Sequence, residues 1–276
     1  MSNINAENRP LAAVTGASSG IGFELAKELA RRGYDLVIAS DTGAIGDAGR
    51  DFEQSGAIVQ SIQADLARPE GVQKFYEAVK ASGRPLDVMV LNAGVGVGGD
   101  FALETDLNAE LNLINLNVIS AVHLSKLVLK DMVARGQGRL LFTSSIAGVA
   151  PGPFEAVYAA SKAFLFSFSE ALRNELKDKG VTVTALMPGA TETNFFHRAG
   201  MDDTKVGQSE KDDPAEVAKE GIEAMLAGKD RVVAGSFKNK VLATAGRLMP
   251  TTAAEIHRKQ AEPRSKQEET ETANRK

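Results

Sequence analysis

The chain has 276 residues, of which 43% are hydrophobic and 25% are charged, so its composition is that of a globular protein able to bury a large core. Its formal net charge of -4 gives no electrostatic reason to expect a nucleic-acid partner. The lack of cysteine excludes disulfides and thiolate nucleophiles, and the three histidines are too far apart in sequence to suggest a metal site.

The first residues, 1–9, are polar and are expected to form a flexible N-terminus. They contain no apolar segment of the kind found in secretory signals. Nowhere does an uninterrupted apolar run approach the roughly 18 residues of a membrane-spanning helix. A cytoplasmic protein without a membrane span is therefore expected.

Short apolar runs recur along the chain and predict buried strands, at residues 11–15, 36–39, 58–62, 86–91, 139–142, 181–187 and 231–233. Segments of helical length and periodicity separate most of these runs, the longest of them at about 105–134 and 155–178. This alternation predicts a doubly wound parallel sheet of the Rossmann type with helices on both faces. No repeat or flexible linker interrupts it, so residues 10–250 are expected to form one α/β domain.

The end of the chain has a different character. Residues 237–248 place several apolar side chains on one helical stripe, namely Phe237, Val241, Leu242, Ala245 and Leu248. Such a stripe can lie on a membrane surface or cover a pocket, but more often it packs on its own domain or on a neighbouring subunit. Residues 251–276 are expected to be a polar, partly disordered tail.

Glycines cluster at the junction between the first predicted strand and the helix after it. Gly16, Gly20 and Gly22 would allow a tight turn there and let backbone N–H groups approach a pyrophosphate at the helix N-terminus. Their G-x-x-x-G-x-G spacing differs from the usual G-x-G-x-x-G fingerprint, and no Walker lysine follows. The same stretch also fits G-x-S-x-G, the nucleophile elbow of α/β-hydrolases. Only one strand precedes Ser18, however, and the histidines have no evident acidic partner, so the hydrolase interpretation is disfavoured.

A tyrosine and a lysine, Tyr158 and Lys162, stand four residues apart in the second long helical segment. Residues at this spacing share one helix face, which brings a phenol beside an ammonium. A neighbouring cation favours the phenolate and lowers the pKa of the phenol, so the pair can exchange protons nearer neutrality. Such pairs also occur by chance on solvated helices, and the interpretation therefore depends on the other motifs.

Together these features make the chain resemble the short-chain dehydrogenase/reductase family, over about residues 10–235. The motifs that carry the resemblance are Thr15–Gly22 (TGASSGIG), Asp65-Leu66, Asn92-Ala93-Gly94, Asn117-Val118, Ser144-Ser145, Tyr158 with Lys162, and Pro188-Gly189 with Thr193. They occur in the family's order and spacing. The resemblance implies an oxidoreductase that transfers a hydride between a nicotinamide dinucleotide, NAD or NADP, and a carbonyl compound or secondary alcohol.

The resemblance also implies roles for the candidate catalytic residues. Tyr158 would act as general acid in reduction and general base in oxidation, while Lys162 would lower the pKa of Tyr158 and hold the nicotinamide ribose. Ser145 would donate a hydrogen bond to the carbonyl oxygen as that oxygen gains negative charge. Asn117 would anchor a water that relays protons past Lys162, or it is only a polar residue interrupting a helix. Ser144 is expected to be a structural neighbour.

The expected cofactor-binding residues are those of the glycine loop, the strand ends and the tyrosine–lysine pair: Gly16, Ser18, Ser19, Gly20, Ile21, Gly22, Ser40, Asp41, Asp65, Leu66, Asn92, Ala93, Gly94, Tyr158, Lys162, Pro188, Gly189, Thr191 and Thr193. A carboxylate at the end of the second strand suits a free ribose 2′-hydroxyl and repels a 2′-phosphate. Asp41, together with the lack of a nearby cation before Arg50 and the presence of Ser19 in the glycine loop, therefore favours NAD over NADP. The family's ribose-binding acid usually falls one residue earlier, at the position of Ser40, which could bond either cofactor.

Apolar residues next to these motifs could form a pocket for a hydrophobic ketone, aldehyde or secondary alcohol. The candidates are Val95, Val97, Pro151, Phe154, Phe195 and Phe196, with a variable lid expected over residues 194–213. Apolar side chains near a site also serve simple packing. The alternative function is a dinucleotide-binding sensor or interaction module without turnover, but such a protein has no need of Ser145, Tyr158 and Lys162 together.

The two longest predicted helices are apolar on more than one side, through Leu113, Leu116, Leu124, Leu127 and Leu129 in the first and Phe164, Leu165, Phe166, Phe168 and Leu172 in the second. A helix that is apolar on several faces must be buried on several faces. Proteins of the family that the chain resembles commonly form dimers or tetramers through these two helices. A homodimer or homotetramer is therefore predicted.

Overall fold

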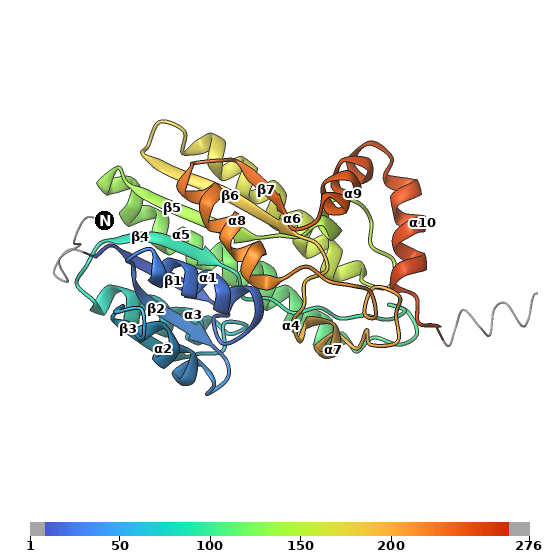
Figure 1. Cartoon of the computed structure of the whole chain (residues 1–276), viewed down its shortest axis with the longest axis horizontal. Helices are drawn as coiled ribbons and strands as arrows, with labels where there is room; N and C mark the ends of the chain where they lie inside the picture. Colours follow the sequence, from blue (N-terminus) through green and yellow to red (C-terminus); the bar gives the residue numbers. More distant parts are fainter. Residues whose placement is uncertain (1–8, 265–276) are drawn as a thin grey trace, which may run out of the picture.

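The computed structural model describes residues 9–264, and its centre is a seven-stranded sheet in the order β3-β2-β1-β4-β5-β6-β7 (Figure 1). Every strand pairing is parallel. The strands are β1 (Leu11–Thr15), β2 (Asp35–Ser40), β3 (Val59–Gln63), β4 (Leu86–Leu91), β5 (Gly138–Thr143), β6 (Val181–Pro188) and β7 (Arg231–Ala234). The doubly wound α/β fold predicted from the sequence is thus confirmed.

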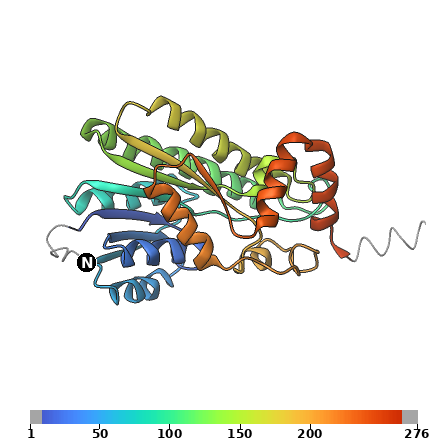
Figure 2. The ribbon, with the colours of Figure 1, turned by 45° about the horizontal axis from the view of Figure 1, so that its top comes forward.

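Helices cover both faces of this sheet (Figure 2). One core is formed with α1 (Gly20–Arg31), α2 (Ile45–Glu53) and α8 (Pro214–Leu226), and the other with α3 (Pro69–Ala81), α5 (Ser120–Arg135) and α6 (Ala156–Glu175). Neighbouring strand residues alternate between them, because successive side chains of a strand point to opposite faces. Val14 belongs to the first core and Ala13 to the second. Burial on both faces is why the central strands read as nearly unbroken apolar runs, whereas β3, at the edge of the sheet, is more polar and more exposed.

The first long helical segment is not a regular α-helix throughout. It consists of α4 (Leu107–Ile114), a π-helical turn (Asn115–Ile119) and α5. By length and apolar composition alone the stretch Leu107–Arg135 could cross a membrane, with a mean hydropathy of 1.3 in its most apolar window. Core helices pass the same test, and α5 contributes Leu124, Val128 and Met132 to the sheet core.

The order of the strands determines where a ligand can bind. The chain builds outward from β1 through β2 to β3, then returns to place β4 on the other side of β1. The connections that follow β1 and β4 therefore lead to opposite faces, which opens a crevice at the carboxyl ends of these strands. The glycine loop follows β1 at this edge.

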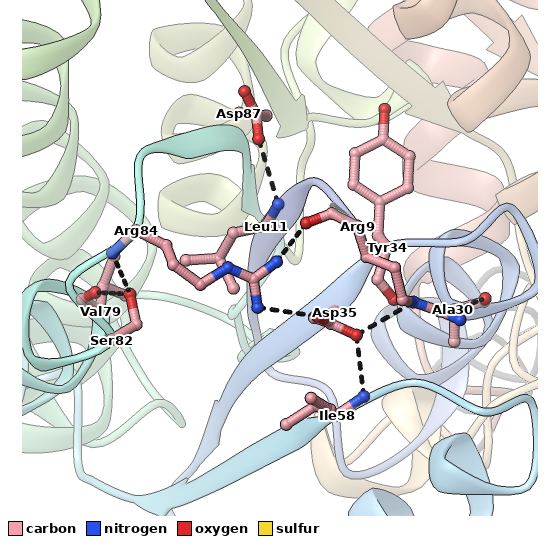
Figure 3. A network of polar contacts seen from close by, with 10 residues as sticks. All are labelled: Arg9, Leu11, Ala30, Tyr34, Asp35, Ile58, Val79, Ser82, Arg84 and Asp87. Atoms are coloured by element: carbon pink, nitrogen blue, oxygen red, sulfur yellow. Dashed lines mark hydrogen bonds and ion pairs between the residues drawn. The ribbon is translucent and has the colours of Figure 1, made fainter. Parts of the chain in front are cut away.

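At the amino-terminal ends of the strands, opposite the crevice, a buried carboxylate connects several segments. It belongs to Asp35, at the start of β2 (Figure 3). Its side chain is 2% exposed and forms ion pairs with Arg9 at 3.0 Å and Arg84 at 2.7 Å. It also accepts a hydrogen bond from the backbone N–H of Ile58 at 2.9 Å. These contacts join the segment before β1, the start of β2 and the approaches to β3 and β4, far from the crevice.

The end of the chain differs from the expectation of a tail from residue 251. Helix α9 (Phe237–Leu248) has the bounds of the predicted apolar stripe, and α10 (Pro250–Ala261) follows it almost directly. Figures 1 and 2 show the two helices side by side at one end of the molecule. The helical pattern of residues 250–261 is weak, and besides α9 the helix contacts segments far away in sequence, at Pro153 and Glu155, so local sequence gave little sign of it. Residues 1–8 and 265–276 lie outside the described part of the chain.

Candidate active site

The glycine loop between β1 and α1 forms a cradle of backbone atoms. Gly16 and Gly20 have φ values of 68° and 60°, in the left-handed region that favours glycine. A Cβ on Gly22 would overlap the carbonyl oxygen of Gly16. Helix α1 begins at Gly20, and the side chain of Ser19, its N-cap, makes no capping hydrogen bond, so the first N–H groups of the helix are left to a ligand. The loop therefore fits a pyrophosphate.

Hydroxyl and carboxylate groups extend the site along the ends of β2 and β3. Ser18 Oγ lies 2.8 Å from Ser40 Oγ, which donates a hydrogen bond to Asp41 at 3.2 Å. Asp65 accepts a hydrogen bond from the backbone N–H of Ala67 at 2.9 Å. These groups suit the hydroxyls of a ribose and the amino group of an adenine.

Asn92 ties the end of β4 to the glycine loop. Its amide nitrogen donates to the carbonyl oxygen of Thr15 at 3.2 Å, and the hydroxyl of Thr15 accepts from the backbone N–H groups of Asn92 and Ala93 at 2.9 and 3.0 Å. A Cβ on Gly16 would lie 2.9 Å from the Ala93 Cα. The close packing of two loop backbones explains why glycine and a small residue meet here.

Ser145, Tyr158 and Lys162 come together at the carboxyl end of β5 and the start of α6. The Lys162 ammonium donates to the carbonyl oxygen of Thr143 at 2.9 Å and lies 5.6 Å from the centre of the Tyr158 ring. The Ser145 hydroxyl accepts from the N–H of Ala147 at 3.0 Å, and Ser145 also hydrogen-bonds the Tyr158 side chain. All three side chains line one cleft of about 540 Å³ that begins at the glycine loop.

Burial governs the proton affinities of this group. The pKa of Tyr158 is raised by its removal from water and by the negative charge of Glu155, while the hydrogen bond with Ser145 acts in the opposite direction. Burial lowers the pKa of Lys162 to about 8. Lys162 was expected to lower the pKa of Tyr158. In the chain by itself desolvation is the larger effect, and the phenol is held protonated.

All of the residues expected to bind the cofactor line this cleft. They are Gly16, Ser18, Ser19, Gly20, Ile21, Gly22, Ser40, Asp41, Asp65, Leu66, Asn92, Ala93, Gly94, Tyr158, Lys162, Pro188, Gly189, Thr191 and Thr193. Of the expected substrate residues, Val95, Phe195 and Phe196 line it, whereas Val97, Pro151 and Phe154 do not. Ser144 donates its hydroxyl proton to the carbonyl oxygen of Lys162 at 2.7 Å, which is a structural contact.

Asn117 does not line the cleft, because its side chain is engaged elsewhere. It accepts from the N–H of Val95 at 2.9 Å and donates to the carbonyl oxygen of Val95 at 2.9 Å and to Ser161 Oγ at 3.1 Å. The π-helical turn aims Asn117 at these partners. Its side chain therefore fixes Val95, in the wall of the cleft, against α6.

The sequence reasoning missed the far wall of the cleft, which α9 and α10 supply. Leu242, Met249 and Ile256 line it with apolar surface and are 37%, 55% and 48% exposed. Glu155 and His257 add a polar contact to the same wall. The apolar stripe at 237–248 was the available signal, and covering a pocket was one of its expected uses.

The sequence model of the short chain dehydrogenase family matches residues 10–204. The probable oxidoreductase EphD of Mycobacterium tuberculosis is 34% identical over 203 residues, which are 71% of this chain and 34% of that protein. The chain thus spans about a third of the length of the first curated relatives it matches.

Two solved structures are similar over most of their length. One is a short-chain dehydrogenase from Sphingobium yanoikuyae in complex with NADPH, with a TM-score of 0.75 and 31% identity, covering 81% of this chain and 87% of that one. The other is the bulky-bulky ketone specific alcohol dehydrogenase from Comamonas testosteroni, with a TM-score of 0.73 and 25% identity, covering 88% of this chain and 95% of that one.

Proposed function

Since the chain belongs to the short-chain dehydrogenase family, we propose that it transfers a hydride between a nicotinamide dinucleotide and a carbonyl compound or secondary alcohol. The observation that carries this proposal is the convergence of Ser145, Tyr158 and Lys162 on the cleft that starts at the glycine loop. A hydroxyl donor, a phenol and an ammonium are the groups needed to stabilise and protonate an oxygen that receives negative charge.

The cleft fits a dinucleotide. The uncapped start of α1 and the left-handed glycines would hold the pyrophosphate, and Asp65 and Asn92 border the adenosine end. When bound, the nicotinamide supplies or accepts the hydride. Lys162 would contact the nicotinamide ribose, as the family resemblance implies.

The proton chemistry belongs to the chain's own residues. In reduction the Tyr158 phenol gives its proton to the carbonyl oxygen, and in oxidation the phenolate takes one from the alcohol. Burial keeps Tyr158 protonated near neutrality, which suits the donor role. Ser145 orients the reacting oxygen through a hydrogen bond. Asn117 takes part indirectly, by holding Val95 and α6 in place.

NAD is the proposed cofactor in preference to NADP. Ser18, Ser40 and Asp41 offer hydroxyls and a negative charge near the adenosine ribose. Among the described residues that line the cleft, the lysine and arginine side chains are those of Lys162 and Arg198, neither of which belongs to the β2 end. The similar structure from Sphingobium yanoikuyae binds NADPH. Titration with both cofactors decides between them, and Asp41→Asn is expected to weaken the preference for NAD.

A bulky, apolar ketone or secondary alcohol is the proposed substrate. Phe195 and Phe196 line the cleft, and Leu242, Met249 and Ile256 add further apolar surface to it. The similar enzyme from Comamonas testosteroni is described as specific for bulky-bulky ketones. A series of ketones of increasing size should show kcat/KM rising with apolar bulk, and Ile256→Ser should remove that rise while leaving small ketones unaffected.

The central test is hydride transfer from NADH and NADPH to this ketone series, followed at the nicotinamide absorbance. Tyr158→Phe is expected to lower kcat by about 10²–10⁴-fold, the usual contribution of a general acid. Tyr76→Phe is the matched control, since Tyr76 contacts Asp131 on α3 and α5 away from the cleft. Full turnover by Tyr158→Phe would reject the mechanism. Cofactor binding without any turnover would favour a sensor or interaction module.

The homo-oligomer remains part of the proposal. Apolar side chains of α4, the π-helical turn and α6 are exposed in the single chain, among them Leu107, Leu111, Ile114, Ile119 and Phe164. Ile114, Val118, Val157 and Phe164 also line a shallow hollow between these helices. A second copy of the chain would cover this surface.

A further inference from the structure

Helix α10 meets the site at a contact that the proposed proton transfer does not use. His257 places Nε2 3.2 Å from Glu155 Oε2, and Nδ1 3.2 Å from the carbonyl oxygen of Pro153. The side chain of Glu155 is 6% exposed and that of His257 is 22% exposed, and both line the cleft. Glu155 is the N-cap residue of α6, and Tyr158 follows one turn later.

These contacts determine how many protons the pair holds. The Pro153 carbonyl can only accept, so Nδ1 of His257 must be protonated to bond it. Either Nε2 is protonated as well and faces an ionised Glu155, or Glu155 is protonated and donates to Nε2. Both forms contain one shared proton and carry no net charge. Without that proton, a nitrogen lone pair faces a carboxylate, and a buried negative charge is left unbalanced.

That charge would act on the catalytic tyrosine. Glu155 is the N-cap of α6 and Tyr158 is the third residue of the helix, so the two side chains belong to the same first turn. The negative charge of Glu155 raises the pKa of Tyr158. Ser145 also hydrogen-bonds the Tyr158 side chain, and the Lys162 ammonium lies 5.6 Å from the centre of its ring.

Several other charged groups lie on or near α10. Arg258 stacks over the ring of Phe154, 5.2 Å from its centre, and Glu255 is exposed and does not line the cleft. Arg198 and Glu210 line the cleft from the lid region after β6. Phe154 has a φ of 63°, a backbone conformation that a bulky residue rarely adopts. Through His257 and Arg258, helix α10 thus contacts a loop with a strained residue, directly before α6.

We propose that Glu155 and His257 form a positioning pair, whose shared proton fastens α10 to the loop before α6 and balances the carboxylate beside Tyr158. The pair thereby sets the pH range over which the tyrosine works. The inference rests on the proposed function, in which Tyr158 is the general acid and base. It gives α10 a part in the chemistry as well as in the shape of the pocket.

The test compares pH profiles of alcohol oxidation and ketone reduction for Glu155→Gln and His257→Gln. The limb of the pH profile that reports ionisation of Tyr158 is the quantity to compare. Removing the carboxylate makes the phenolate easier to form, so this Tyr158 limb should move to lower pH. Removing the histidine leaves the carboxylate unbalanced, so the limb should move to higher pH. A separation of one pH unit gives about a tenfold difference in oxidation rate at a pH below both limbs. Glu255→Gln, which removes the same charge from the exposed side of α10, should leave the limb unchanged.

A purely structural role predicts a different pattern, in which both variants lose activity without moving the limb or move it in the same direction. Either result would overturn the proposal. Hydrogen exchange of the α10 amides supplies a readout that needs no substrate. Exchange over residues 250–261 should be about tenfold faster in His257→Gln than in Glu255→Gln, and equal rates would refute the fastening role. Tyr158→Phe distinguishes a failure of the proposed function from a failure of the positioning pair. Full activity in that variant rejects the proposed function, whereas the hydrogen-exchange result for α10 does not depend on it.

Discussion

Replacing Asp35 by asparagine should destabilise the fold without altering the site. The carboxylate is 2% exposed and receives Arg9, Arg84 and the N–H of Ile58. An asparagine keeps one acceptor oxygen but turns its NH₂ group toward a donor, so at least one guanidinium loses its partner. Breaking a buried ion pair in this way costs about 3–5 kcal/mol.

The lower end of that range is expected, because the Arg84 side chain is 35% exposed and can be partly rehydrated. A loss of about 3 kcal/mol corresponds to a fall in Tm of roughly 6–12 °C for a chain of this size. The Lys80–Asp131 pair offers a matched control, since its atoms are 2.8 Å apart but its side chains are 56% and 46% exposed. Asp131→Asn should cost at most about 1 kcal/mol.

Urea unfolding and thermal melts of the two variants measure this difference directly. Turnover at 25 °C should match that of the unsubstituted protein in both, because the Asp35 network lies at the edge of the sheet opposite the cleft. A Tm for Asp35→Asn equal to that of Asp131→Asn would refute the reasoning. So would a loss of turnover in Asp35→Asn under conditions where it is fully folded.

Three further predictions concern the site and the exposed helices. Burial lowers the pKa of Lys162 to about 8, so its ammonium is present below that pH and lost above it. The rate of ketone reduction should therefore decline as the pH rises through about 8. A rate that stays constant across that range would contradict this prediction. Gly22→Ala should abolish cofactor binding in a fluorescence titration, since its Cβ has no room, whereas Gly46→Ala, where nothing lies within 4 Å, should bind normally. If the chain forms the proposed oligomer, Phe164→Glu and Ile114→Glu should each convert it to monomers in light scattering, because a charge in an apolar interface is unpaired there. An unchanged oligomer mass would exclude this surface as the interface.

The sequence predicted the central strands well because they are buried on both faces, whereas the edge strands β3 and β7 are only partly buried. The predicted run at 11–15 coincides with β1, and that at 86–91 with β4. Residues 237–248 form α9 as their apolar stripe indicated. In each case a local pattern is sufficient, since the burial of a segment dictates its own residue types.

Other features depend on contacts between segments far apart in sequence. Helix α10 has few apolar residues, and the contact between His257 and Glu155 joins segments about a hundred residues apart. The proximity of Asn117 to Val95 requires a π-helical turn that no composition reveals. The substrate candidates were chosen because they are close to the motifs in sequence, and only some of them reach the cleft. Phe195 lines the cleft, while Phe154 lies under Arg258.

Burial also explains why the spacing of Tyr158 and Lys162 did not by itself give the sign of the tyrosine's pKa shift. An ammonium stabilises a phenolate only while it is charged, and the same dry surroundings that raise the pKa of Tyr158 lower that of Lys162 to about 8. Both groups are therefore driven toward their neutral forms, a phenol and an amine. The side chains alone leave the tyrosine protonated but weakly acidic, so proton transfer in either direction is helped by further charges that favour the phenolate. Because Glu155 opposes the phenolate, the partner that balances its charge influences both directions of the reaction.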